Sequence, residues 1–331
     1  MAATANQKLK TLYIKRLLET ETDSEHGVTM ERILQYLESN GIDAERKSVY
    51  TDLDHLRAFG MDILAVRRKQ TEYMLVSRPF QIAELKLLVD AVSASKFITH
   101  KKSLELIKKL EGEASIHEAR ALQRQVFVQS RIKTMNESIY YSVDTIHTAI
   151  NSDRQMSFCY FDYSTDKQRI MRRNGMKYKV SPLSLVYSDE NYYLAAYTEE
   201  REEIVNFRVD RMTEVGISRD ERIKNEKTES FDPAGYTNSQ FSMYGGKREN
   251  VDILFENSLA TVVIDRFGKD IIMRPQGSTH FMVSVSVDIS PTFFGWIFMF
   301  GEKAWITGPK KVIKQFSGMA SKIAESYPQI D

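Results

Sequence analysis

Residues 181–212 limit the fold of this chain more than any other stretch, because apolar and polar residues alternate there over several short runs. Turn-forming residues at 188–191 and a charged segment at 198–203 separate those runs. This is the pattern of short, half-buried strands joined by tight turns. The stretch therefore predicts a β-meander.

Three side chains of this meander are candidates for a binding site. Strand side chains alternate between two faces, so Phe207 and Val209 are expected to point inward and Arg208 toward the open face. Tyr193 is expected on the face opposite its two neighbours, and Arg211 follows where the strand can turn. Two guanidinium groups near a phenol suit a planar, anionic ligand.

The same residues carry a resemblance to a known family. A proline, a short strand, an aromatic-Tyr-Leu triplet and a Phe-Arg-x-Asp-Arg motif, in this order, resemble the WYL domain of bacterial transcription regulators, with Tyr192 in place of the family's tryptophan. The resemblance implies a small Sm-like β-barrel in which Tyr193, Arg208 and Arg211 have a ligand-binding role. A winged-helix-like segment precedes this core, and a segment similar to the family's C-terminal extension, WCX, follows it.

Length and composition limit the possible function classes. A chain of 331 residues is long enough for two or three domains, and 42% apolar residues favour folded structure. The 46 basic and 45 acidic residues give a net charge of +1, so any nucleic-acid-binding surface has to be local. The single cysteine, Cys159, excludes an intramolecular disulfide and fits a reducing compartment. The longest apolar run, residues 293–300, is shorter than the roughly 20 residues that a membrane span needs, so we expect a soluble, cytoplasmic protein.

Residues 1–78 have the pattern of a winged helix-turn-helix domain. Apolar residues at helical spacing predict three helices, the second capped by Thr29 and the third ending at Gly60. Two predicted strands follow, joined by a cationic hairpin tip. The predicted helices and strands are, in order, residues 8–20, 29–41, 45–59, 62–66 and 73–76.

The third of these helices predicts a DNA-binding surface. In helix-turn-helix folds the recognition helix enters the major groove, and a basic wing lies along the backbone or minor groove. Exposed cations on an amphipathic helix are also typical of a surface that only contacts water. The order of helices and basic hairpin favours double-stranded operator DNA as the partner. The candidate DNA-binding residues are Arg46, Lys47, Ser48, Tyr50, Thr51, Arg67, Arg68 and Lys69.

The rest of the chain predicts four further segments. Residues 79–138 form a helical connector with helices at 81–95, 103–110 and 115–128, which spaces or dimerises the DNA-binding domains or transmits a change to them. Residues 139–220, the WYL-like domain, begin with a helix at 143–151 and continue in short strands, which implies a strongly bent sheet or barrel. The predicted strands are residues 155–160, 177–180, 183–187, 192–196, 204–209 and 213–218.

A polar linker at 221–249 separates this domain from a C-terminal domain at 250–331. There the order strand, helix, strand, strand, helix, strand predicts a ferredoxin-like fold, and Phe294-Gly295-Trp296 resembles a Phe-Gly-Trp segment of the WCX extension. The fold class expected for the whole chain is multidomain α+β. The predicted elements of this domain are residues 251–255, 258–267, 270–274, 280–289, 291–300, 303–307 and 310–326.

Sequence motifs for catalysis, metal binding and common cofactors are missing. The chain has no dinucleotide-binding glycine motif, no P-loop and no nucleophile elbow, and its six histidines are scattered. Cys159 lies in a predicted strand between two aromatic residues, where a buried thiol is expected rather than a nucleophile. We therefore expect no enzyme activity, no cofactor and no metal, although a catalytic site assembled from distant segments has no sequence signature.

A ligand site on the bent sheet is better supported. Its candidate residues combine stacking surfaces with cations that bind phosphate. For Arg208 and Arg211 the alternative is salt bridging to Asp210 or Glu214, and for Tyr160 it is a place in the core. The candidates are Tyr160, Lys179, Tyr193, Arg208 and Arg211.

These features together predict a homodimeric, sequence-specific transcriptional regulator whose WYL-like domain senses a nucleotide or a single-stranded nucleic acid. The alternative is a protein whose main activity is binding RNA or single-stranded nucleic acid through that domain. In that case the basic stretch 167–179, which contains no acidic residue, should matter more than residues 46–51.

Overall fold

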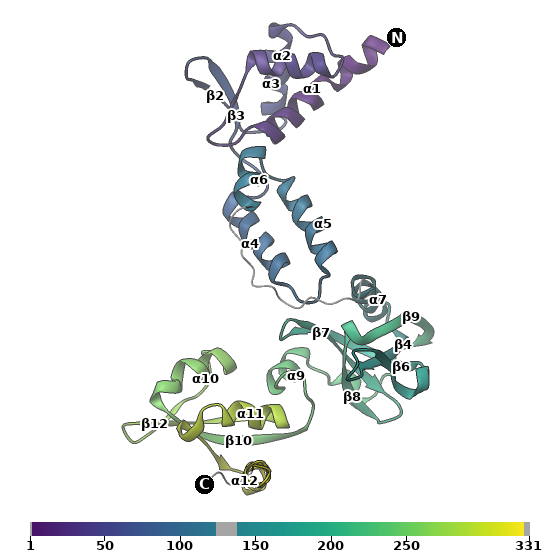
Figure 1. Cartoon of the computed structure of the whole chain (residues 1–331), viewed down its shortest axis with the longest axis vertical. Helices are drawn as coiled ribbons and strands as arrows, with labels where there is room; N and C mark the ends of the chain where they lie inside the picture. Colours follow the sequence, from purple (N-terminus) through teal and green to yellow (C-terminus); the bar gives the residue numbers. More distant parts are fainter. Residues whose placement is uncertain (1, 124–137, 328–331) are drawn as a thin grey trace. The chain divides into compact units, whose positions relative to one another are not determined.

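The computed structural model describes residues 2–123 and 138–327, which belong to two compact units, Met1–Glu137 and Ser138–Asp331 (Figure 1). Each unit combines helices with antiparallel sheet, so the chain is an α+β protein. Within the described ranges, no helix is both long and apolar enough to cross a membrane.

The first unit begins with three helices that pack around one core with a small sheet. Leu17, Leu37 and Leu53, one from each helix, are completely buried there, as their helical spacing predicts. The sheet has the strand order β1-β3-β2. The elements are α1 (Ala2–Glu21), β1 (Val28–Thr29), α2 (Met30–Ser39), α3 (Arg46–Ala58), β2 (Ile63–Arg67) and β3 (Thr71–Leu75).

Local signals set the ends of these helices. The Thr29 hydroxyl caps α2 by accepting a hydrogen bond from the backbone N–H of Arg32 at 3.2 Å. Gly41 and Gly60 follow α2 and α3 with φ of 73° and 107°, a left-handed conformation that favours glycine. The hairpin tip is shorter than predicted, because β2 and β3 pair as far as Arg67 opposite Thr71.

The first unit continues with the three connector helices α4 (Ile82–Ala94), α5 (His100–Glu111) and α6 (Ile116–Gln123). Helix α5 begins earlier than predicted because Thr99 caps it, accepting from the backbone N–H of Lys102 at 3.3 Å. The predicted continuation of the third helix to residue 128, and the connector from 124 to 137, lie outside the described residues.

The second unit begins with helix α7 and a curled six-stranded sheet (Figure 1). Its strand order is β5-β4-β6-β7-β8, and β9 pairs with β4 off this path. The elements are α7 (Ile139–Asn151), β4 (Arg154–Tyr163), β5 (Arg169–Met171), β6 (Tyr178–Ser188), β7 (Asn191–Thr198), β8 (Glu203–Arg208) and β9 (Met212–Glu221).

One strand of this sheet corrects the sequence analysis. The two strands predicted at 177–180 and 183–187 form the single strand β6, which runs through Pro182. The register with β7 shifts between Pro182 and Ser184, which is the kind of irregularity where a strand tolerates a residue without an N–H. A proline that suggested a break therefore marks a bulge.

The predicted linker 221–249 contains more regular structure than expected. Two short helices, α8 (Glu226–Glu229) and α9 (Pro233–Ser239), lie in it, and Asp232 caps α9 by accepting from the backbone N–H groups of Ala234 and Gly235. The strand after it begins at Lys247, inside the predicted linker. The linker prediction missed these elements because short capped helices have too little apolar periodicity to stand out.

The C-terminal domain is a four-stranded antiparallel sheet with the strand order β11-β12-β10-β13, together with three helices. Phe255, Val283 and Phe293 lie in its core. The strand predicted at 270–274 was displaced, because Ile271 and Met273 pack against the core ahead of the paired residues. The elements are β10 (Lys247–Glu256), α10 (Ala260–Phe267), β11 (Arg274–Gln276), β12 (His280–Ile289), α11 (Pro291–Phe298), β13 (Ala304–Gly308) and α12 (Lys310–Glu325).

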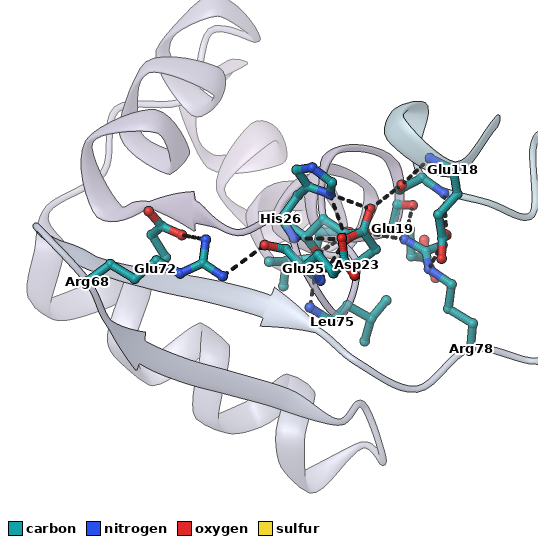
Figure 2. Close-up of polar contacts among 12 residues, drawn as sticks. Glu19, Asp23, Glu25, His26, Arg68, Glu72, Leu75, Arg78 and Glu118 are labelled. Carbon is teal, nitrogen blue, oxygen red and sulfur yellow. Dashed lines mark hydrogen bonds and ion pairs between the residues drawn. The ribbon is translucent and has the colours of Figure 1, made fainter. Parts of the chain in front are cut away.

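In the first unit, a buried carboxylate joins the three-helix part to the connector. Asp23, only 3% exposed, accepts hydrogen bonds from Ser115 Oγ at 2.6 Å and from His26 Nδ1 at 2.9 Å (Figure 2). Arg78 donates to the backbone oxygen of Glu19 at 2.7 Å and to that of Thr22, beyond the end of α1. Burial alone would raise the pKa of Asp23, but the hydrogen bonds from Ser115, Glu25 N and His26 lower it to about 2.

Replacing Asp23 should therefore destabilise this unit in a pH-dependent way. Because the folded pKa lies below the unfolded one, the stabilisation is complete above about pH 4 and is lost as pH falls toward 2. We expect Asp23→Asn to cost about 2 kcal/mol at pH 7, measured by hydrogen exchange of the α1 and β3 amides. The matched control is Asp54→Asn, since that carboxylate is exposed. A wild-type advantage that stays constant from pH 7 to pH 2 would contradict this role.

Candidate functional site

Strands β7 and β8 bring the two central candidate residues together. Tyr193 lies directly opposite Arg208 in the antiparallel register, so both side chains lie on the same face of the sheet. Phe207 and Val209 are buried, as the alternation of the strand predicts. The β-meander therefore places Arg208 beside Tyr193 on the face opposite the core.

Arg208 is held by a carboxylate and an amide. Its Nε and Nη2 donate to Asp210 at 3.0 and 2.9 Å, and Nη2 also donates to Asn191 Oδ1 at 2.8 Å. The hydrogen bonds to Asp210 raise the pKa of Arg208 above its usual range. The alternative of an ion pair with Asp210 is thus confirmed for Arg208, whose side chain remains about one third exposed.

Arg211 shares a different carboxylate, Asp162 of β4. Asp162 accepts two hydrogen bonds from Arg172, at 2.5 and 3.1 Å, and one from Arg211 at 3.2 Å. The hydrogen bond from Arg172 is the main reason that the pKa of Asp162 lies below its usual range. Arg211 does not use the predicted alternative, since Glu214 pairs with Lys177 at 3.0 Å. Two guanidinium groups therefore meet at one half-exposed carboxylate.

Tyr160 lies in the core, as its alternative predicts. It is 5% exposed, and its ring packs against Phe207 and Tyr178 at centroid distances of 5.6 and 6.1 Å. Its hydroxyl accepts a hydrogen bond from the backbone N–H of Arg208 at 3.1 Å, while the Arg172 guanidinium lies 5.2 Å from the ring centroid. Burial raises the pKa of Tyr160, and the hydrogen bond from Arg208 offsets part of that shift. Tyr160 therefore holds the backbone of Arg208 from the core side of the sheet.

The remaining two candidates lie in different surroundings. Lys179 of β6 forms an ion pair with Asp220 of β9 at 2.8 Å, and this hydrogen bond raises its pKa. Tyr193 is 8% exposed, because Met243 and Tyr236 from the segment after the curled sheet pack against it. The structure thus groups Tyr160, Tyr193 and Arg208 by direct contact or pairing, and Lys179 belongs to a separate ion pair.

Sequence analysis missed Arg172, Arg173 and Asp162 as members of this site. Arg173 stacks its guanidinium 4.0 Å from the Tyr178 ring centroid and pairs with Glu200. The available signal was the basic stretch 167–179, which contains both arginines. Nothing in the sequence connects that stretch to Asp162, because the hairpin pairing of β4 with β5 brings them together.

The candidate DNA-binding residues lie on the first unit. Arg46, Lys47, Tyr50 and Thr51 are exposed on α3, whereas Val49, Leu53 and Leu56 of the same helix are buried. Arg67 and Lys69 are exposed at the hairpin. Ser48 and Arg68 already contact other segments of this unit: Ser48 accepts a hydrogen bond from Lys10, and Arg68 contacts Glu72 at 3.2 Å and the backbone oxygen of Glu25 at 2.9 Å (Figure 2).

Tyr50 has a further contact with the hairpin. Burial, together with the interaction with Tyr50, raises the pKa of Tyr73 to about 12. Tyr50 itself remains 48% exposed. The α3 surface is therefore tied to β3 at one point while its cations face solvent.

Metal-ligating side chains are not clustered in the part of the chain that the structure describes. No group of three or more His, Cys, Asp and Glu residues is placed to hold a metal ion there. Cys159 is buried, and its thiol donates to the backbone oxygen of Gly175 at 3.3 Å, as expected for an inert thiol.

Comparisons with known proteins identify the curled sheet. Residues 142–217 match the WYL domain family, and this range contains all five ligand-site candidates. No curated protein matches the chain.

Two similar solved structures are proteasome accessory factor B/C (PafBC) of Arthrobacter aurescens and a CRISPR Cas-related protein. The first is 18% identical over 96% of this chain, with a TM-score of 0.28, and this chain spans about half (49%) of its length. The second is 13% identical over 74% of this chain and 70% of its own, with a TM-score of 0.35.

The Tyr160 hydroxyl should protect the Arg208 amide. We expect Tyr160→Phe to leave that partly buried N–H without its acceptor and to destabilise β8 by about 1 kcal/mol. Hydrogen exchange of the Arg208 amide, resolved by NMR, measures the effect. Tyr163→Phe on the same strand, whose ring is exposed, is the control. Equal exchange in the two variants would show that the hydroxyl does not hold β8.

Proposed function

We propose that this WYL-domain protein is a sequence-specific DNA-binding transcriptional regulator in which a nucleotide or single-stranded nucleic acid on the WYL domain changes the DNA-binding state of a homodimer. The observation that carries the proposal is that charged residues are exposed in two separate places, one on each unit of the chain. Exposed cations of α3 and its hairpin lie on the first unit, and a set of half-exposed arginines lies on the WYL domain. Exposed cations suit binding to the DNA backbone, and arginines suit bidentate binding of a phosphate ligand.

The first 78 residues are proposed to be a winged helix-turn-helix. Three helices and a three-stranded sheet with a basic hairpin support this assignment, and α3 would be the recognition helix. Its exposed Arg46 and Lys47 suit phosphate or guanine, and Tyr50 and Thr51 suit phosphate oxygens and base edges. Homodimerisation follows from the same geometry, because palindromic half-sites are read by two copies related by two-fold symmetry.

The other domains are proposed with the boundaries 79–138 for the connector, 139–220 for an Sm-like WYL barrel, 221–249 for the linker and 250–331 for a ferredoxin-like WCX domain. The C-terminal sheet supports the last of these. Its chain order β10-α10-β11-β12-α11-β13 is the ferredoxin-like order, and β10 and β12 are the two central strands.

On the sensor, a phosphate group would compete with Asp162 and Asp210 for the guanidinium groups that these carboxylates hold. Arginine is suited to this exchange, because its planar fork binds carboxylate and phosphate in the same bidentate way. A ligand shifts the regulator only through different affinities for its two states, and a nearly complete switch needs about 5.5 kcal/mol.

The first test is binding of labelled duplex from the promoter of the chain's own gene, over a salt series, with and without short single-stranded DNA. Tight, sequence-selective and salt-dependent duplex binding is the expected result. Sequence-indifferent duplex binding beside tight single-strand binding would instead favour the second candidate function, in which the WYL domain is the main nucleic-acid-binding module. That candidate is supported by the arginines of 169–173, which lie over the Phe161, Tyr160 and Tyr178 rings.

Substitutions on α3 should weaken operator binding. We expect Lys47→Ala to lower affinity about equally for all duplex sequences and to reduce the slope of log affinity against log salt by about 1. Tyr50→Ala should lower operator affinity by about 1–3 kcal/mol if it contacts a base. Lys101→Ala, which removes an exposed lysine of α5, is the control. Unchanged affinity in both α3 variants would place the DNA contact on another surface.

Removal of two sensor arginines should separate DNA reading from sensing. We expect Arg208→Ala combined with Arg211→Ala to bind operator normally without effector and to lose the response to single-stranded DNA. Lys310→Ala combined with Lys314→Ala removes the same charge from α12 and should respond normally. A normal response of the arginine variant would locate the sensor elsewhere.

A further inference from the structure

The face of the WYL sheet that carries Tyr193 is covered by the protein's own chain. Residues 236–244, which we call the strap, run from α9 across the ends of β6, β7 and β8. Met243 is 5% exposed and packs with Tyr193 and Val186, and Tyr236 packs against the same cluster. The apolar side chain of Met243 therefore covers the ring of Tyr193.

One amide of the sheet fixes the strap in this position. Asn206 of β8 donates from Nδ2 to Gln240 Oε1 at 2.6 Å and to the backbone oxygen of Met243 at 2.9 Å. Its Oδ1 accepts from the hydroxyl of Tyr236 at 3.2 Å. Both ends of the amide are thus satisfied by strap residues alone, and separating the strap from the sheet breaks all three hydrogen bonds together.

The other side of the strap is docked on the C-terminal domain. Phe241 packs against Phe293 and Trp296 at centroid distances of 5.2 Å each, and its backbone oxygen accepts from Thr292 Oγ1 at 2.8 Å. Arg266 of α10 donates to the backbone oxygen of Gln240 and stacks 4.0 Å from the Phe241 ring centroid. Gln240 therefore contacts the WYL domain through its side chain and the C-terminal domain through its backbone.

One hydrogen-bond donor at the contact between the strap and the C-terminal domain has no partner in the part of the chain that the structure describes. Arg266 is half-buried, its buried Nε has no acceptor among the described residues, and burial lowers its pKa. A buried donor without a partner destabilises the state that contains it. The strap is thus held on the sheet by three hydrogen bonds and Met243, and on the C-terminal domain by Phe241 and the incompletely paired Arg266.

We propose that the strap is a built-in competitor of the sensor ligand, and that its displacement carries the signal from the WYL domain to the C-terminal domain. This inference rests on the proposed sensing function and adds its mechanism. A base can stack on Tyr193 only where Met243 now lies, so ligand binding and strap docking exclude each other. Because Gln240 and Phe241 belong to the same short segment, a strap that leaves Tyr193 also pulls on Arg266 and Trp296.

The chain contains its own reporter for this event. It has two tryptophans, Trp296 beneath the strap and Trp305 on β13, so Trp305→Phe leaves a single emitter in contact with Phe241. The experiment adds a short oligothymidylate to the full chain carrying Trp305→Phe. Binding is measured by calorimetry, and Trp296 emission is followed in parallel. We expect the emission to shift with the same saturation curve as binding.

A second variant tests competition directly. Met243→Ala removes the side chain that covers Tyr193, and we expect it to bind the oligothymidylate about tenfold more tightly. Met299→Ala removes an exposed methionine of the same compact unit and should bind like the parent.

The outcomes separate this inference from the proposed function. Binding without a change in Trp296 emission, with no gain for Met243→Ala, overturns the strap mechanism and leaves sensing intact. No binding to either the parent or Met243→Ala overturns both. Binding to Met243→Ala alone supports the strap as the competitor.

Discussion

Carboxylates neutralise the arginines of the WYL sheet, and this pairing sets where those side chains lie. Arg172 and Arg211 share Asp162, Arg208 is held by Asp210, and Arg173 pairs with Glu200. Without these partners the four guanidinium groups on this small curled sheet would repel one another. Each pair is partly exposed, so it contributes little net stability and can be exchanged. These carboxylates thus keep the arginine side chains of the sheet ordered and paired.

Much of the fold was predictable because its signals are local. Thr29 as a cap, Gly41 and Gly60 after helices, and a strand that matches the predicted range 280–289 all follow from short-range chemistry. The misses have equally local causes. Pro182 suggested a break but occupies a bulge, and β1 has two residues, too few for any periodicity. Its pairing with β3 is set by tertiary contacts instead.

The candidate site was predictable in part, for a different reason. The alternation of side chains along a strand puts Arg208 on the face away from the buried Phe207 and Val209. This placement depends on one strand alone, so the sequence is enough to predict it. The identity of each ionic partner depends on which strands pair. Arg211 selects Asp162, 49 residues away, over the nearby Glu214. The burial of Tyr193 was also beyond prediction, because the covering residues come from a segment without a periodic pattern.

The buried link between Asp23 and Ser115 has a consequence for dividing the protein into transferable parts. A sequence-based cut at residue 78 would separate the carboxylate from its hydroxyl partner and would also remove the Glu113 oxygen and the Glu118 carboxylate from Arg78. The smallest piece that keeps these groups satisfied extends through α6. For grafting onto another protein, the three connector helices therefore belong with residues 2–78, and a chimera joined after residue 123 keeps the contacts of Asp23 with Ser115 and of Arg78 with Glu113 and Glu118.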